Sequence, residues 1–291
     1  MPGGDILDDS IYMLWRALLY PKLSLRSRTA LGVYESAEAL YEERVSAAML
    51  LGGQDPDKLL NYPLMHAAEI YAKCEAAGIQ VLFPNDSGYP GKLDILAEKP
   101  QVLFVKGSLE GIGRSCAVIG ARNADSYAVQ LTRKLSRELA RRGITVFSGF
   151  AVGIDRAAHL GALDASGRTA AVLGSGILFD YPRGSMALKE LIAERGAVIS
   201  EYPPDEPPLP EHFLIRNRIT AALSDCVLCT QAAARSGSLN TAGYALEQSK
   251  PVFVTPPHNI LDGSCEGMIS LLRDGAEQVY SAEDIIRGCY G

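Results

Sequence analysis

The sequence lacks the features of a secreted or membrane-spanning protein. Its first residues, MPGGDILDDS, carry acids where a secretory signal needs a basic start. No apolar run in the 291 residues approaches the roughly 18 residues that a membrane helix requires. We therefore expect a cytoplasmic protein that does not associate with membranes.

The chain also lacks a disulfide framework and a recognisable metal-binding motif. Its six cysteines are scattered through a chain that is long enough to fold around an apolar core without them. Only Cys226 and Cys229 have the spacing of metal ligands, but they lie in the apolar run CVLC and no second pair follows. We expect reduced thiols, no bound metal and no cofactor.

Basic residues are fewer than acidic ones, with 28 Lys and Arg against 34 Asp and Glu, and the net charge is -6. This balance argues against a protein that binds nucleic acid over its whole surface, because phosphate contacts require Lys and Arg. The distribution is uneven, since residues 114–142 contain seven basic and two acidic residues. This segment is either a directed anion site or a solvated helix face.

Two regions of different composition follow one another along the chain. Residues 10–75 lack the alternation of strands and are rich in Ala, Leu, Glu and Tyr. From Gly78 onward, apolar and β-branched runs such as IQVLFP begin, as is typical of buried strands. The sequence predicts a small, all-helical domain over residues 1–76 and a second domain over residues 77–291.

Short apolar runs without polar alternation recur beyond Ser115, separated by helical stretches. Such runs are expected of parallel strands that are covered on both faces. They predict an α/β fold with a doubly wound, mostly parallel sheet. Ligands of such sheets bind in the loops that follow the carboxyl ends of the strands. The predicted strands are CAVIGA, ITVFSG, TAAVLGSG, AVISEY, CVLCTQ and PVFVTP.

The first of these loops places an arginine at the start of a helix. Gly120 lets the backbone approach a ligand closely, and Arg122 follows it before a helix that Asp125 or Ser126 is expected to cap. An anion here would meet a guanidinium and the positive end of the helix dipole. The alternative is an arginine that pairs with a neighbouring acid.

The second loop, SGFAVGID, resembles a nucleotide-binding turn but lacks the Lys-Ser/Thr of a P-loop and the GxGxxG spacing. Asp155 is placed to cap the following helix, and His159 lies four residues later on the same helical face. We expect a structural hydrogen bond between them. A catalytic dyad is the weaker interpretation because no Ser or Cys nucleophile stands out in this segment.

The remaining loops add further arginines and a turn of small residues. Arg183 precedes a helix expected to begin near Ser185, and a Pro-rich segment leads to Arg216 and Arg218. Two residues apart on a helix, these arginines point about 200° from each other, so one can face a ligand while the other anchors the helix. A backbone nest suited to an anion follows at Ser236, Gly237 and Ser238, with Arg235 beside it.

The order of motifs from about residue 80 to 285 resembles that of the DNA-processing protein A family (DprA/Smf). The resemblance implies an extended Rossmann fold that holds single-stranded DNA in a basic pocket, forms a homodimer and loads the RecA recombinase during natural transformation and recombination. It also implies that the helical domain over residues 1–76 is SAM-like. It implies a binding protein and no enzyme. The motifs are DSGYPGKL, KPQVLFVKG, IGAR, SGFAVGID with AAH, LGSG with DYP, ISEYPP, FxxRNRI, SGSLNTA and LLRDGA.

By this resemblance, residues from four loops carry the DNA pocket, and Phe150, Phe213 or Tyr181 are available to stack on a base. Some positions depart from the family pattern, notably Ala121 in place of Ser and Gln231 in place of Glu. The predicted DNA- and phosphate-binding residues are Gly120, Arg122, Arg183, Arg216, Arg218, Ser236, Gly237 and Ser238.

Two other functions compete with DNA binding. An enzyme acting on nucleoside monophosphates is one, because phosphoribohydrolases on a related fold place a GGxGT-like turn before a helix that carries Glu. SGSLNTAGYALE, with Glu247, is a loose counterpart of that pattern. The other is an interaction scaffold that has lost DNA binding, which the acidic balance and the altered loops favour.

Overall fold

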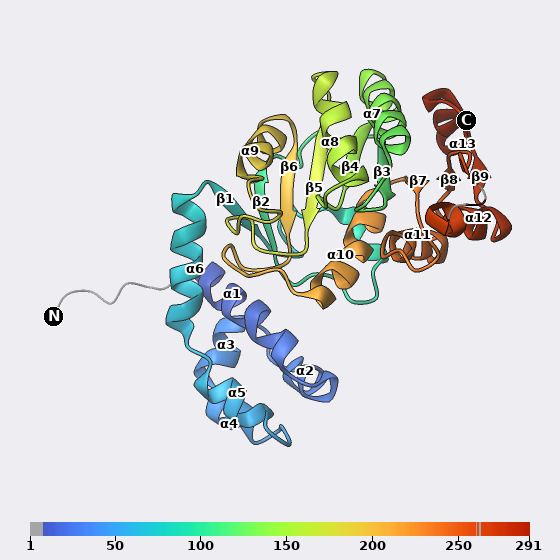
Figure 1. Cartoon of the computed structure of the whole chain (residues 1–291). Coiled ribbons are helices and arrows are strands. Elements are labelled where there is room, and N and C mark those ends of the chain that lie inside the picture. Colours follow the sequence, from blue (N-terminus) through green and yellow to red (C-terminus); the bar gives the residue numbers. More distant parts are fainter. Residues whose placement is uncertain (1–7, 260, 262) are drawn as a thin grey trace. The chain divides into compact units, whose positions relative to one another are not determined.

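A computed structural model gives the fold, and it describes residues 8–259, 261 and 263–291 (Figure 1). The chain divides into two compact units, of which the first ends at Phe83 and the second begins at Pro84. The composition of the sequence placed the boundary near residue 76. The division lies later because the strand Ile79–Leu82 packs with the helix that precedes it.

The first unit is built from short helices around a buried tryptophan. Trp15 is fully buried, and its indole N–H donates to the carbonyl of Tyr62 at 2.9 Å, so the polar edge of this large ring is satisfied. Ser24 and Ser36 cap two of the helices by accepting backbone N–H groups. Its elements are α1 (Asp9–Leu19), η1 (Tyr20–Lys22), α2 (Leu25–Leu31), α3 (Ala37–Glu42), α4 (Arg44–Ala48), α5 (Asp55–Asn61), α6 (Leu64–Ala76) and β1 (Ile79–Leu82).

The second unit contains the predicted doubly wound sheet, in the order β2-β6-β5-β4-β3-β7-β8-β9. Strand β2 runs antiparallel to β6, and the other pairs are parallel, which confirms the mostly parallel Rossmann-like sheet. The strands are β2 (Leu103–Gly107), β3 (Ser115–Gly120), β4 (Thr145–Ser148), β5 (Thr169–Leu173), β6 (Ala197–Ser200), β7 (Cys226–Gln231), β8 (Val252–Val254) and β9 (Glu277–Gln278).

The chain order reverses between β3 and β7. Strands β4, β5 and β6 follow β3 on one side, whereas β7, β8 and β9 extend on the other. Such a switch point opens a crevice at the carboxyl ends of the two central strands, because the loops that leave them run in opposite directions. The sheet topology thus directs attention to the loops after Gly120 and Gln231.

Helices connect the strands and cover the sheet (Figure 1). Helices α7, α8 and α13 share one apolar cluster with β3, β4, β7 and β8, while α10 and α11 pack against each other. The helices are α7 (Ser126–Arg141), α8 (Ile154–Asp164), α9 (Met186–Arg195), α10 (Pro210–Leu223), α11 (Ser238–Glu247), α12 (Glu266–Arg273) and α13 (Ala282–Tyr290), with η2 (Gly91–Ile95) and η3 (Gly263–Cys265).

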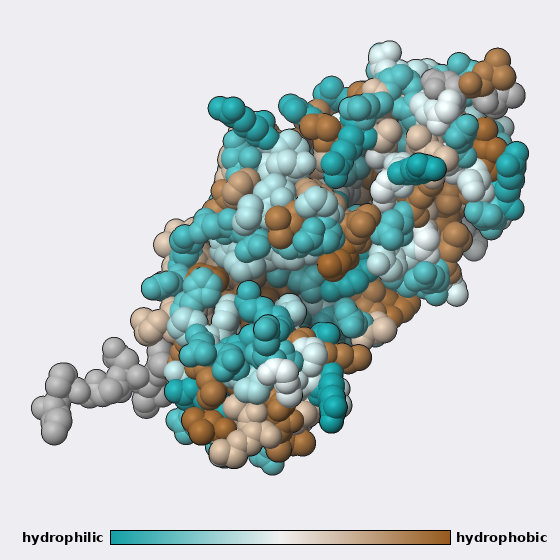
Figure 2. Space-filling model, turned by 60° about the horizontal axis from the view of Figure 1, so that its bottom comes forward, coloured by the Kyte–Doolittle hydropathy of each residue, from teal (hydrophilic) through white to brown (hydrophobic). Residues whose placement is uncertain are grey.

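Among the described residues, no helix has the length and apolarity needed to cross a membrane. Figure 2 shows hydrophilic side chains interspersed with apolar ones over the face it presents. All six cysteines are free thiols. The described part of the chain brings together no group of three or more acidic, His or Cys side chains that could hold a metal ion.

Helices α7 and α8 approach each other closely at Gly161. A Cβ atom at this position would collide with the backbone carbonyl of Arg133 and lie 2.9 Å from the Cβ of Ser136. Backbone atoms cannot move aside as a flexible side chain can. An ion pair between Arg133 Nε and Asp164 Oδ2, 2.5 Å apart, spans the same two helices.

Substitution of Gly161 with Ala should therefore lower the free energy of unfolding by about 1 to 3 kcal/mol, because the two helices must separate. Gly243 in α11 is the matched control, since a Cβ there meets no atom within 4 Å. Gly243→Ala should raise the free energy of unfolding by about 0.5 to 1 kcal/mol through helix propensity. Urea denaturation measures both, and equal effects of the two substitutions would contradict the close packing.

Candidate functional site

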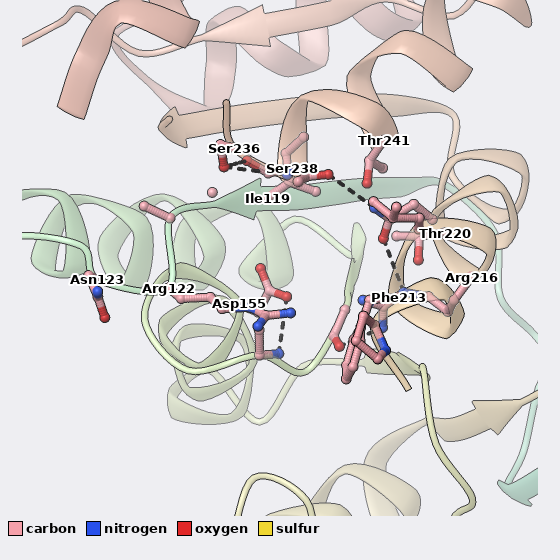
Figure 3. A pocket seen from close by; sticks show the side chains of 18 of the residues that line it. Ile119, Arg122, Asn123, Asp155, Phe213, Arg216, Thr220, Ser236, Ser238 and Thr241 are labelled. Atoms are coloured by element: carbon pink, nitrogen blue, oxygen red, sulfur yellow. Dashed lines mark hydrogen bonds between the residues drawn. The ribbon is translucent and has the colours of Figure 1, made fainter. Parts of the chain in front are cut away.

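A pocket of about 760 Å³ opens at the switch point, at the carboxyl ends of β3 and β7 (Figure 3). The loops that follow β3, β4, β5, β6 and β7 all contribute to its wall, as the topology predicts. Of the predicted binding residues, those that line it are Gly120, Arg122, Arg216, Ser236, Gly237 and Ser238.

Arg122 is the exposed cation of the loop between β3 and α7. Its guanidinium carbon lies 5.0 Å from the centre of the Phe213 ring, and it makes no ion pair with any described residue. A cation over an aromatic face keeps its hydrogen-bond donors free at the edges. An acid is nevertheless part of its surroundings, because the charge of Arg122 opposes the rise in pKa that burial gives the Asp155 carboxylate.

The start of α7 has the expected N-cap residue, Asp125, and the side-chain amide of Gln231 also contacts it. Asp125 accepts the N–H of Ala128 at 2.9 Å, which confirms it as the N-cap. Gln231, at the end of β7, donates to the Asp125 carboxylate at 2.5 Å and accepts the Asp125 N–H at 3.1 Å. An amide can donate to a carboxylate and a glutamate cannot, which accounts physically for glutamine at this position.

Gly120 has a structural role that differs from the predicted one. A Cβ on this residue would lie 2.6 Å from Cγ1 of Ile154 and 2.9 Å from the carbonyl of Gln231. The close approach that requires glycine is therefore to α8 and β7. Gly120 lines the pocket, as predicted. The sequence, however, indicated a close approach of the backbone to a ligand as the reason for glycine.

One wall of the pocket is aromatic. The rings of Tyr181 and Phe213 lie 5.6 Å apart, centre to centre, and both residues line the pocket. The third aromatic residue considered from the sequence, Phe150, has only 5% of its surface exposed and cannot stack on a base. Its ring faces the protein interior, 5.8 Å from the ring of His159.

Arg216 is buried at the floor of the pocket, and the protein accepts hydrogen bonds from its Nε and Nη1. Nη1 donates to the carbonyl of Gly149 at 2.6 Å and to that of Val172, and Nε donates to Asn217 at 3.1 Å. Burial lowers the pKa of Arg216 to about 10, although the nearby carboxylate of Asp155 opposes that shift. Arg216 thus holds β4, β5 and α10 together.

Arg218, on the same helix, anchors α10 away from the pocket. Its Nη2 donates to both carboxylate oxygens of Glu201, at 2.7 and 3.0 Å. Arg216 lines the pocket and Arg218 does not, and that one arginine of the pair faces a ligand stays a prediction. Arg183 is exposed on the loop before α9 and does not line the pocket.

The start of α11 forms the wall opposite the aromatic residues. The hydroxyls of Ser236 and Ser238 lie 2.6 Å apart, and Arg235 beside them is exposed. Asn217 donates to the carbonyl of Gly237 at 3.1 Å and so ties α10 to this turn. Sequence reasoning missed Asn217, although its place between the two arginines of the RNR motif marks it.

The structure corrects the expected contacts of Asp155 and His159. Gly153 occupies the N-cap position of α8, and Asp155 lies buried in its first turn, where burial raises its pKa and its carboxylate accepts the N–H of Ala151 at 3.1 Å. His159 Nδ1 lies 2.7 Å from Thr169 Oγ1, so the hydrogen bond expected between Asp155 and His159 is wrong. Burial lowers the pKa of His159 to about 3, which keeps it neutral.

Glu247 does not reach the pocket. It is the last residue of α11, whose first residue, Ser238, lines the pocket, and it is exposed at the far end of that helix. A helix of this length separates its ends by roughly 14 Å, at 1.5 Å per residue. The counterpart proposed for a phosphoribohydrolase carboxylate is therefore not at the candidate site.

The sheet order and the pocket define a Rossmann-like α/β protein with a ligand crevice at the topological switch point. Residues 80–289 match the sequence model of the family described as DNA recombination-mediator protein A. The chain therefore belongs to this family of DNA processing proteins (DprA/Smf), which confirms the resemblance seen in the motifs.

Several bacterial proteins are similar in sequence to this chain. DNA processing protein DprA of Bacillus subtilis is 37% identical over 218 residues, which cover 74% of this chain and 73% of that protein. Protein Smf of Escherichia coli is 42% identical over 208 residues, or 70% of this chain and 55% of that protein.

Two solved structures resemble this fold. DprA of Streptococcus pneumoniae superposes with a TM-score of 0.81 and 30% identity over 99% of this chain and 100% of that one. DNA processing protein A of Helicobacter pylori, described for its single-stranded DNA binding mode, has a TM-score of 0.64 and 33% identity over 72% and 95% of the two chains.

The burial of Arg216 generates a prediction about stability. Arg216→Gln should lower the free energy of unfolding by about 3 kcal/mol or more, because two backbone carbonyls lose their donor and Asp155 loses its nearby cation. Arg122→Gln, in the same pocket but exposed, should change it by less than about 0.5 kcal/mol. Denaturant titrations of the two variants make the comparison, and equal stabilities would show that Arg216 is not a structural centre.

Proposed function

We propose that this chain binds single-stranded DNA in the pocket at the switch point, mainly through the phosphates, and catalyses no reaction. The observation that carries the proposal is the placement of Arg122, an exposed guanidinium held over the Phe213 ring in a pocket that the start of α11 also lines (Figure 3). A helix N-terminus and a free guanidinium attract the same phosphate oxygens.

The two walls of the pocket favour a nucleotide strand over an isolated anion. Polar groups from Arg122, Arg235 and the turn at 236–238 suit phosphates, and Tyr181 and Phe213 suit the flat face of a base. Stacking is possible with every base, so binding should be largely independent of sequence. A duplex hides its base faces, which favours the single strand.

Family membership supports the wider role. The family description names a mediator of DNA recombination, and a relative is described for its single-stranded DNA binding mode. We infer that the chain processes and protects incoming single strands in the cytoplasm during natural transformation, loads the RecA recombinase onto them and acts as a homodimer. Arg183, exposed on the loop that carries Tyr181, is proposed to contact the strand outside the pocket.

The groups at the pocket also favour binding over catalysis. His159 is buried, neutral and bonded to Thr169, and it does not line the pocket, so it is not free to transfer a proton to a ligand there. Glu247 is remote from the pocket. These placements argue against the phosphoribohydrolase alternative.

Arg122→Ala should weaken binding of a labelled poly-dT strand by about 1 to 3 kcal/mol, the range for loss of a charge-assisted contact. The slope of log affinity against log salt should become shallower by about 0.7, because one phosphate contact is lost. Fluorescence anisotropy at several salt concentrations measures both quantities, with an equal length of duplex as competitor.

Arg141→Ala is the matched control for this experiment. Arg141 is an exposed arginine at the last residue of α7, whereas the pocket lies before the first residue of that helix. The control removes the same charge and should leave affinity nearly unchanged. If wild type fails to bind at low salt, or if Arg122→Ala and Arg141→Ala behave alike, the proposed pocket is wrong.

A further inference from the structure

Lys189 in the first turns of α9 is a buried lysine that the proposed function does not use. Only 1% of its surface is exposed, and it makes no ion pair with a described acid. Its ammonium group instead donates to the carbonyls of Ile177 and Phe179, at 3.0 and 2.6 Å. Burial lowers its pKa to about 8, although Asp180 and Glu190 oppose that shift.

These two carbonyls belong to the loop between β5 and α9, which carries Tyr181 of the aromatic wall. The carbonyl of Phe179 also accepts the backbone N–H of Tyr181 at 2.9 Å. Lys189 and Tyr181 therefore share one acceptor. The loop is fixed again one residue later, where the Asp180 carboxylate accepts the N–H groups of Gly184 and Ser185 at 2.8 and 3.0 Å.

Lys189 also contacts the neighbouring loop. Its ammonium lies 5.8 Å from the centre of the Phe150 ring, and Phe150 follows Gly149, whose carbonyl accepts from Arg216. Phe150 has a φ of 62°, a left-handed conformation that a bulky residue adopts only when its surroundings hold it. The ammonium of Lys189 thus donates hydrogen bonds to the β5–α9 loop and lies over an aromatic ring of the β4–α8 loop.

We infer that Lys189 is a positioning residue for DNA binding: by fixing the Phe179 carbonyl it sets Tyr181 against Phe213 and so forms the surface on which a base stacks. The inference rests on the proposed function of the pocket. Lys189 does not touch the strand. It acts through the Tyr181–Phe213 pair, whose rings are 5.6 Å apart, and Phe213 in turn lies under Arg122.

Lys189→Met keeps the length of the side chain and removes the donors. It should weaken binding of a poly-dT strand by about five-fold or more. This loss is smaller than the loss of affinity expected when a stacked base is removed entirely. An abasic strand of equal length carries the same phosphates without bases. Its affinity, measured at low salt by anisotropy, should be the same for wild type and Lys189→Met.

The chain offers a closely matched control in Lys250. Its ammonium also donates to two backbone carbonyls, those of Ala221 and Ala222 at 2.8 and 2.7 Å, and burial lowers its pKa to about 8 as well. None of these residues lines the pocket. Lys250→Met should leave the affinity for both strands unchanged.

A double-mutant cycle separates positioning from general stability. In a Phe213→Ala background the stacking surface is gone, so adding Lys189→Met should cause no further loss of poly-dT affinity. Additive losses, equal losses on the abasic strand, or a Lys250→Met variant as weak as Lys189→Met would each overturn the inference. If wild type binds poly-dT and Lys189→Met binds it equally well, the role of Lys189 is wrong and the proposed function stands. If wild type does not bind poly-dT, the proposed function is wrong as well.

Discussion

The buried guanidinium of Arg216 is the interaction on which the candidate site depends. It links the ends of β4 and β5, through the carbonyls of Gly149 and Val172, to helix α10. The adjacent Asn217 extends the link to the turn before α11. A buried charge is costly unless its donors are satisfied, and here two backbone carbonyls and the Asn217 amide accept from it while the charge of Asp155 lies nearby. Moving any of these segments would break hydrogen bonds of that buried charge.

This arrangement divides the arginines of the pocket into two roles. Arg216 and Arg218 are used within the protein, whereas Arg122 and Arg235 are exposed and make no ion pair with the described residues. The division explains how a chain with a net charge of -6 can present a local site for an anion. Attraction of phosphates depends on the few cations that face the pocket and far less on the total charge, since distant charges are screened within about 10 Å at 0.1 M salt.

Much of the fold could be predicted from the sequence, because parallel strands buried on both faces appear as uninterrupted apolar runs. The same rule placed the functional loops at one edge of the sheet. The roles of individual side chains could not be predicted. Helical geometry shows that Arg216 and Arg218 point in different directions, but only the positions of Val172 and Glu201 show what each one meets. Likewise, His159 of helix α8 forms a hydrogen bond with Thr169 of strand β5, a contact that the spacing of residues along α8 cannot reveal.

The contrast between the walls of the pocket explains why binding should be orderly and yet independent of sequence. In the proposed binding mode, Arg122 and the start of α11 contact the phosphates of a strand, while the Tyr181–Phe213 wall offers a flat apolar surface instead of hydrogen bonds to base edges. Such a wall discriminates by geometry, and its geometry is set by groups that no ligand touches. In the proposed mode, the buried polar contacts of Arg216 and Lys189 hold the segments behind this wall, and the exposed charge lies in front of it.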